Sequence, residues 1–160
     1  IGLSGYWGKY NDLDDDISGV GVDWLSTWGP LELTGEYAHF SIDEPDFTSG
    51  SVTDVPKTMD GYHIQANYHF WPEFLSGTFL GRSFDDPTFT LVSRYGWAKI
   101  DDDSDSTTGD NEETRYTLGL NYRPIESWVF KLEYQWNATD NEALERGDNN
   151  GLMWSTAMGF

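Results

Sequence analysis

The ionisable and nucleophilic side chains of this chain offer few combinations that could perform chemistry. Cysteine is absent, which excludes a thiolate nucleophile, a disulfide framework and a thiolate metal site. The three histidines, His39, His63 and His69, are too scattered to form a metal site. No nucleophile–base–acid set and no glycine-rich phosphate loop stands out. We therefore expect neither an enzyme nor a bound cofactor.

One acidic stretch has the spacing of a cation-binding loop. Asp101, Asp103, Asp105 and Glu112 follow the order of the oxygen ligands in an EF-hand. However, Ser106 stands where that loop needs glycine, and the flanking segments have the pattern of strands and not of helices. A solvated acidic loop explains the stretch better than a specific ion site does. Binding of Ca²⁺ or Mg²⁺ at acidic outer loops is therefore kept as an alternative.

The elements that would position the remaining charges alternate between apolar and polar residues, which indicates strands with two unlike faces. In 128–137, one face carries Trp128, Phe130, Leu132, Tyr134 and Trp136, and the other Val129, Lys131, Glu133, Gln135 and Asn137. Eight strands are predicted, at 2–10, 17–28, 31–42, 61–70, 87–100, 114–123, 128–137 and 151–160. Each is close to the ~9–11 residues that a tilted strand needs to cross a bilayer.

The predicted connections also alternate. Long acidic loops follow the first, third, fifth and seventh strands, and tight turns follow the second and sixth, at Gly29-Pro30 and 124–127. Short turns at one end and long loops at the other are typical of outer-membrane barrels. The exception is 71–86, which is long for the turn end. Its aromatic, glycine- and proline-containing sequence indicates a structured excursion, whose place in the fold the sequence does not determine.

The negative charge is concentrated in four polar stretches, 11–16, 43–60, 101–113 and 137–150. They contain 20 of the 28 acidic residues but only two of the nine basic ones, so their charge of −18 is nearly the whole −19. Phosphate binding needs the opposite sign, so nucleic acid is excluded as a partner.

Alternation alone does not decide whether the apolar face packs in a soluble β-sandwich or faces lipid. Aromatic residues at the strand ends favour lipid, because amphipathic rings prefer membrane interfaces. They are Trp28, Trp71, Tyr122 and Trp128 towards the turns, and Tyr62, Trp97 and Trp136 towards the loops. The opposite face is rich in glycine, amides, threonine and paired charges, as a barrel lumen is. The sequence thus predicts an all-β, antiparallel transmembrane β-barrel in one domain, 1–160.

The last segment, 151–160, ends in an aromatic residue preceded by apolar residues at every second position. It resembles the assembly signal of outer-membrane β-barrel proteins, which implies recognition by the barrel-assembly machinery. The matching positions are Leu152, Trp154, Met158 and Phe160, with Thr156 as a mild departure.

Two further runs, 67–82 and 116–133, resemble the C-terminal part of Gram-negative porins of the phosphate-selective porin O/P class. The resemblance covers roughly the last hundred residues. It implies a channel of about 16 strands, of which this chain would hold the final eight. It identifies no substrate and no phosphate-binding residue. The sequence shows no signal peptide, because strand-like sequence begins directly at Ile1, so we expect a processed form or a fragment.

The charges on the polar face divide between two regions. Acidic residues lie on the second and third predicted strands, and basic residues lie on the fifth to seventh, with Glu133 as the only acidic residue predicted among them. In an open lumen, such opposed walls would orient permeating solutes. The predicted pore-lining residues are Glu32, Glu36, His63, Asn67, Arg94, Arg115, Lys131 and Glu133. In a closed eight-stranded barrel the same charges would fill the interior as an ion-pair network.

Two functions follow from these alternatives. The favoured one is a porin in the outer membrane of a Gram-negative bacterium, through which small hydrophilic solutes or ions diffuse passively. The other is a closed eight-stranded barrel with a structural, adhesive or surface-interaction role. In both cases the expected partners are outer-membrane lipid, lipopolysaccharide and the barrel-assembly machinery. Homo-oligomerisation is left open.

Overall fold

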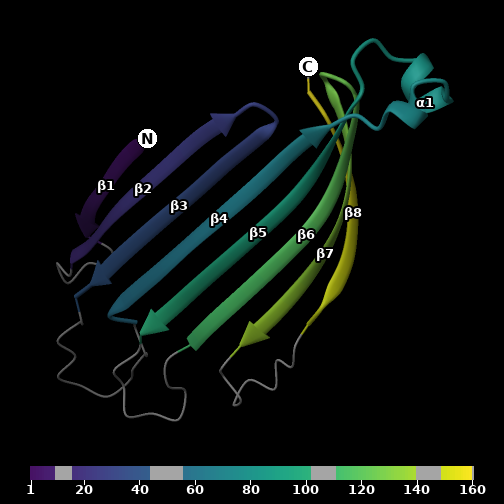
Figure 1. Cartoon of the computed structure of the whole chain (residues 1–160). Helices are drawn as coiled ribbons and strands as arrows, with labels where there is room; N and C mark the ends of the chain where they lie inside the picture. Colours follow the sequence, from purple (N-terminus) through teal and green to yellow (C-terminus); the bar gives the residue numbers. More distant parts are fainter. Residues whose placement is uncertain (10–15, 44–55, 102–110, 140–148, 160) are drawn as a thin grey trace.

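The computed structural model describes residues 1–9, 16–43, 56–101, 111–139 and 149–159. Eight antiparallel strands form one sheet, in which each strand pairs with its neighbours in the sequence (Figure 1). The strands are β1 (Gly2–Lys9), β2 (Asp16–Trp28), β3 (Leu31–Ile42), β4 (Thr58–Phe70), β5 (Thr88–Asp101), β6 (Asn111–Ile125), β7 (Trp128–Thr139) and β8 (Gly151–Met158).

All eight predicted strands are confirmed, and the main differences lie at their ends. β4 begins at Thr58 and β6 at Asn111, each three residues earlier than predicted. Thr58 pairs with Ser41 on β3 and with Asp101 on β5, so the ladder continues into the polar sequence. Cross-strand hydrogen bonds thus extend these strands beyond the point where apolar alternation ends.

The strand register gives the sheet two unlike faces. Leu132 pairs with Leu120 on β6 and with Trp154 on β8, whereas its neighbour Lys131 pairs with Asn121 and Ser155. Directly paired residues lie on the same side of a sheet, and successive residues on opposite sides. We call the side that carries Leu132 the apolar face and the side that carries Lys131 the polar face.

No second layer covers the apolar face in the part of the chain that the structure describes. Within the same ranges, Val92 is the only buried hydrophobic residue, with 4% of its surface exposed. Large side chains of the apolar face are exposed instead, among them Trp28, Ile64, Leu91, Leu118, Leu132 and Trp154. A soluble sandwich would pack this face against a second sheet. A sheet that leaves it bare matches the wall of a transmembrane barrel, where lipid covers it.

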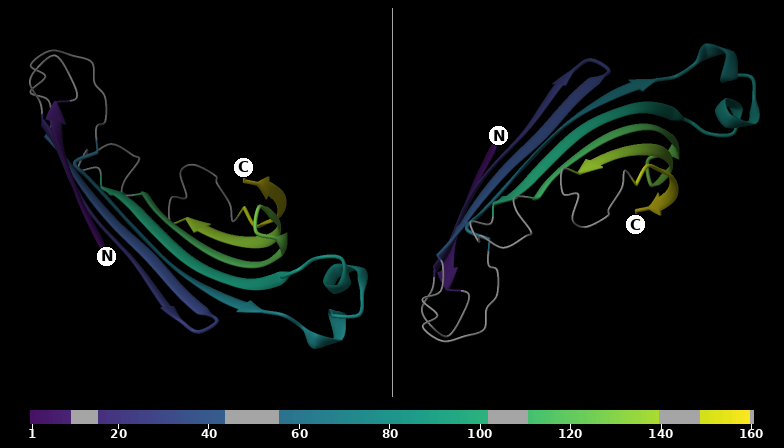
Figure 2. Two further views of the ribbon diagram at one scale, coloured as in Figure 1. Left: turned by 90° about the horizontal axis from the view of Figure 1, so that it is seen from above. Right: turned by 90° about the horizontal axis from the view of Figure 1, so that it is seen from below.

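The sheet is strongly curved, and its C-terminal strands curl towards one side (Figure 2). Asn67, Val92 and Thr117 are buried side chains of the strands, and all three lie on the polar face. Side chains converge on the inner side of a curved sheet, so the polar face is the concave one. β1 pairs with β2 and β8 with β7, but β1 and β8 do not pair with each other in the described residues. The sheet is therefore open.

Aromatic rings form two bands across the apolar face. Towards the loops, Tyr62 contacts Trp97, and Tyr116 contacts Trp136, each pair with ring centroids 5.5 Å apart. Towards the turns, the rings of Phe89 and Tyr122 lie 4.8 Å apart, and Tyr122 stacks with Phe130. This arrangement is the girdle of aromatic side chains that marks both membrane interfaces in outer-membrane barrels.

The two tight turns differ from each other. Gly29 has a φ of +56° at the first central position of the β2–β3 hairpin, where a two-residue turn of this type requires glycine. The second turn is shorter than the predicted 124–127, because β6 continues to Ile125. The register shifts between Tyr122 and Ile125, which indicates a bulge around Pro124. Proline lacks an amide hydrogen, and a bulge is one of the few places in a sheet that tolerates it.

Residues 71–86, which the sequence indicates as a structured excursion of unknown placement, contain two short helices. They are a 3₁₀ helix, η1 (Glu73–Leu75), and α1 (Phe79–Arg82). The segment 71–86, which we call the excursion, projects beyond the turn-side ends of β4 and β5 (Figure 1). Neither helix has the length or the apolar character that spanning a bilayer requires, and no other helix of the described ranges has them.

Candidate functional site

The eight predicted pore-lining residues all lie on the polar face. One paired row runs from Asp23 through Glu36, His63, Gly96 and Arg115 to Asn137. Another runs from Glu32 through Asn67, Val92 and Gly119 to Glu133. Arg94 and Lys131 belong to the adjacent rows on the same side. The structure thus gathers these side chains on one surface, while their role as a pore lining stays a prediction.

A chain of hydrogen bonds links the basic and acidic regions of this face. The Arg94 Nε donates to Gln65 Oε1 at 2.6 Å, and Gln65 Nε2 donates to Asn67 Oδ1 at 2.8 Å. The Asn67 Nδ2 then donates to Glu32 Oε1 at 2.7 Å. Every donor points from the arginine towards the carboxylate, so the amide dipoles align and reinforce one another. We call these three hydrogen bonds the relay. The relay connects Arg94 on β5 with Glu32 on β3 without a direct ion pair.

A second arginine is held in a similar way near the loop end. The Arg115 Nε donates to Asn137 Oδ1 at 2.6 Å. The Asn137 side chain also donates to the carbonyl oxygen of Asn149, and its backbone amide donates to Asn150 Oδ1 at 3.0 Å. This asparagine therefore ties β6, β7 and the segment before β8 together. Its amide oxygen orients the guanidinium.

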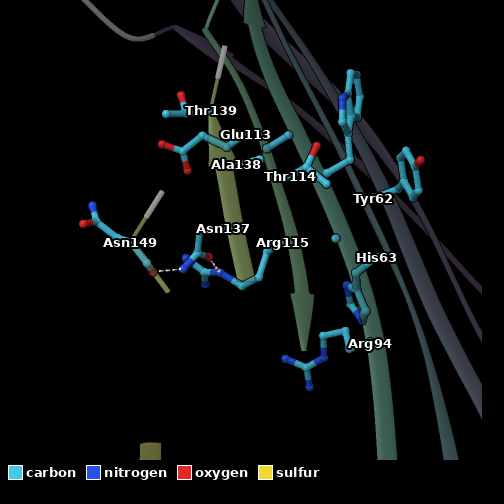
Figure 3. A pocket seen from close by; sticks show the side chains of 13 residues that line it. Tyr62, His63, Arg94, Glu113, Thr114, Arg115, Asn137, Ala138, Thr139 and Asn149 are labelled. Atoms are coloured by element: carbon cyan, nitrogen blue, oxygen red, sulfur yellow. Dashed lines mark hydrogen bonds between the residues drawn. The ribbon is translucent and has the colours of Figure 1, made fainter. Parts of the chain in front are cut away.

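A pocket of about 530 Å³ lies over these groups. Figure 3 shows Arg94, His63 and Arg115 pointing into the same space, with Asn137 and Asn149 closing one side. Among the described residues, neither guanidinium forms an ion pair with a carboxylate. Amide partners satisfy the Nε donors but add no negative charge. The two cations therefore keep their positive potential, which favours an anion in the pocket.

The segregation of charge on this face has two acidic exceptions. Asp23, Glu32 and Glu36 lie on β2 and β3, whereas Arg94, Arg115, Arg123 and Lys131 lie on β5 to β7. Glu133 accompanies the basic residues, as predicted. Glu113 does so as well, because β6 begins earlier than the sequence indicated, and it lines the rim of the pocket.

Sequence reasoning missed three polar residues of this site. The alternation puts Gln65 and Asn137 on the polar face but does not single them out, because neither carries a charge, and Asn149 lies outside the strands. The register places Gln65 beside Arg94 and Asn137 beside Arg115, and Asn149 joins the site by accepting a hydrogen bond from Asn137. A search for amides directly opposite arginines in paired strands would have found the first two.

The model of the phosphate-selective porin O and P family matches residues 6–160, nearly the entire 160-residue chain. The chain belongs to this family. No curated protein matches the sequence. The family match reaches well beyond the last hundred residues that carry the resemblance in the sequence, and it includes the β1–β3 region. A porin is a transport channel of β-barrel construction, so membership identifies the open sheet as part of a barrel wall and favours a channel over an enzyme.

Two other predictions for this porin fall partly outside the described residues. Leu152, Trp154 and Met158 of the predicted assembly signal lie exposed on the apolar face of β8, but Phe160 is not described. Asp101 and Glu112 of the cation-binding pattern lie at the loop-side ends of β5 and β6, where Glu112 accepts a hydrogen bond from Trp97. Asp103 and Asp105 are not described. Both predictions therefore stay open.

Proposed function

We propose that the protein is a passive channel of the Gram-negative outer membrane, in which the polar face lines a water-filled lumen for small hydrophilic anions. The observation that carries this proposal is the pair Arg94 and Arg115, two guanidiniums that share one pocket and whose hydrogen-bond partners among the described residues are amides. The printed description of the family, phosphate-selective porins, supports an anionic solute. The transport needs no cofactor and no bond-breaking step.

The acidic and basic walls of the polar face would orient a charged solute as it passes between them. The acidic wall of β2 and β3 repels an anion, while the basic wall of β5 to β7 attracts it. The anion is therefore expected to follow the basic side and to exchange water for guanidinium donors in the pocket. Glu113 and Glu133 lower the net attraction, which keeps binding weak enough for release.

The open sheet favours this proposal over a closed eight-stranded barrel. A closed barrel needs hydrogen bonds between β1 and β8, and in the described residues each of these strands pairs on one side only. Additional strands would have to complete the wall. A wall of about 16 strands encloses an aqueous channel, whereas eight strands leave room only for side chains.

Three surfaces of the protein support the proposed partners. The apolar face would contact outer-membrane lipid, and β8 would be recognised by the barrel-assembly machinery through Leu152, Trp154 and Met158. At the loop end, the apolar face changes to polar groups. There Asp60 accepts hydrogen bonds from Tyr37 and His39, and Lys99 lies 3.9 Å from Asp101. This rim is suited to the headgroups of lipopolysaccharide, with Ca²⁺ or Mg²⁺ between acidic groups of both molecules.

Conductance in planar bilayers tests the channel. The protein at its native length should give stepwise openings, with a reversal potential in a KCl gradient that indicates preference for chloride. Arg94→Glu and Arg115→Glu should each move that potential towards potassium. Arg82→Glu is the matched control, because it makes the same charge change on the excursion, away from the polar face. A silent bilayer, or an equal shift in all three variants, would contradict the proposal.

A further inference from the structure

The excursion between β4 and β5 exposes large apolar side chains that are not packed against the sheet. The Phe74 side chain is 81% exposed and Phe79 is 69% exposed, although both stand in a segment with defined helices. The segment 71–84 also contains Trp71, Leu75 and Phe84, but only Glu73 and Arg82 as charges. Its net charge is therefore zero, and its composition is typical of a surface that is buried against a membrane or a partner.

The excursion is attached to the lipid side of the wall. Trp71 stacks on Phe89, with ring centroids 5.7 Å apart, and Phe89 belongs to the turn-side aromatic band of the apolar face. Tyr122 of the same band donates a hydrogen bond from its hydroxyl to the Leu80 carbonyl oxygen at 2.7 Å. The aromatic band therefore continues without interruption from β6 and β5 into the excursion.

Local contacts hold the excursion in shape. The Trp71 Nε1 donates to Ser76 Oγ at 3.0 Å, and Thr78 Oγ1 donates to the Leu75 carbonyl oxygen at 2.7 Å. A Cβ atom on Gly81 would lie 2.6 Å from that same carbonyl oxygen and 2.8 Å from the Trp71 ring, so only glycine allows the helix to approach this closely. The Phe79 ring packs edge-on against Phe84. The exposed phenylalanines are thus presented by a folded support.

We propose that residues 71–84 form an interfacial anchor, seated in the boundary between headgroups and acyl chains of the leaflet at the turn end of the barrel. Phe74 and Phe79 would insert into this boundary, and Glu73 and Arg82 would stay among the headgroups. The proposal rests on the membrane placement in the proposed function. The anchor would fix the depth of the wall in the membrane, as interfacial aromatic residues do.

Lipid is the occupant that the contacts favour. The anchor continues the aromatic band that already marks the membrane interface, and it projects past the ends of β4 and β5 at the same end of the wall (Figure 2). Because its net charge is zero, insertion should depend on apolar burial and not on anionic lipid. Zwitterionic vesicles should therefore be sufficient.

The absence of cysteine allows nitroxide labels to be placed one at a time. We would label Phe74→Cys, Phe79→Cys, the matched exposed position Asp86→Cys and the lipid-side reference Leu132→Cys, in the protein at native length in phosphatidylcholine vesicles. Electron paramagnetic resonance then compares collisions with oxygen, which concentrates in lipid, and with a water-soluble nickel complex. The oxygen-to-nickel ratio at 74 and 79 should exceed that at 86 several-fold and approach that at 132. Circular dichroism checks that each variant keeps its β structure.

Three outcomes would overturn the anchor. Nickel-accessible labels at 74 and 79, with an oxygen-accessible label at 132, would refute the anchor and leave the membrane placement intact. Labels at 74 and 79 that are shielded from both reagents would indicate that a second copy or another protein covers the segment. A nickel-accessible label at 132 would refute the membrane placement itself, and the anchor with it.

Discussion

The two faces of β7 are built from the same backbone, yet they meet different surroundings. Leu132 and its paired neighbours Leu120 and Trp154 have no protein layer over them in the described ranges. Glu133, one residue further along, points to the concave face and leans over Gly119 of β6. The difference teaches that a single residue of register separates the apolar face from the polar face. Under the proposed function, such a sheet would derive its stability from one face and its selectivity from the other.

The largest effect should come from placing a charge on the apolar face. Leu132→Arg is expected to lower the free energy of unfolding in lipid by about 2–4 kcal/mol, because the guanidinium would lie near the middle of the bilayer. Gln135→Arg makes a similar addition on the polar face of the same strand and should cost little. Denaturant titrations of both variants in phospholipid vesicles measure the difference. Equal costs would contradict the assignment of the faces.

A smaller loss of stability should follow from one turn glycine. Gly29→Ala forces alanine into a φ of +56°, which costs about 1–2 kcal/mol. Gly77→Ala is its control, because both positions have open space around an added Cβ but only Gly29 has a positive φ. The same titrations apply. If both variants lose equal stability, the cost does not come from the turn conformation.

The smallest of these effects concerns the amide partner of Arg94. Gln65→Glu would turn the hydrogen bond between these side chains into an ion pair and should reduce the anion preference of the channel a few-fold. Gln135→Glu adds the same charge to the polar face, where no hydrogen bond joins residue 135 to Arg94 among the described side chains, and should change selectivity less. Reversal potentials measured side by side decide the matter. A larger shift for the second variant would show that the relay does not set the potential at Arg94.

Most of the fold could be predicted from the sequence, because alternation in segments such as 128–137 directly encodes strands with two faces. Loop lengths indicated the meander, and the charges of the polar face were correctly assigned to one side. The two helices of the excursion could not be predicted, since elements of three and four residues are too short to show a repeated apolar period. Glu113 was missed because polar sequence inside β6 looks like loop until its partner strands are known.

The relay is the part of the site that the sequence predicts least well. The polarity of Glu32, Asn67 and Arg94 within strands predicts their place on the polar face, but no local pattern shows that Gln65 joins them. The connection requires the pairing of Glu32 with Asn67 and of Gln65 with Arg94. Such information is long-range, because it depends on how far each hairpin extends before it turns.

Thiol reactivity along β7 tests the two-faced wall most directly. Single cysteines would replace Phe130, Leu132 and Tyr134 on the apolar face, and Lys131, Glu133 and Gln135 on the polar face. In vesicles that hold the protein at native length, a charged, water-soluble methanethiosulfonate should modify 131, 133 and 135 and leave 130, 132 and 134 unmodified. Protection of all six positions would indicate a filled interior without a channel. Modification of the even-numbered positions alone would mean that the apolar face does not meet lipid.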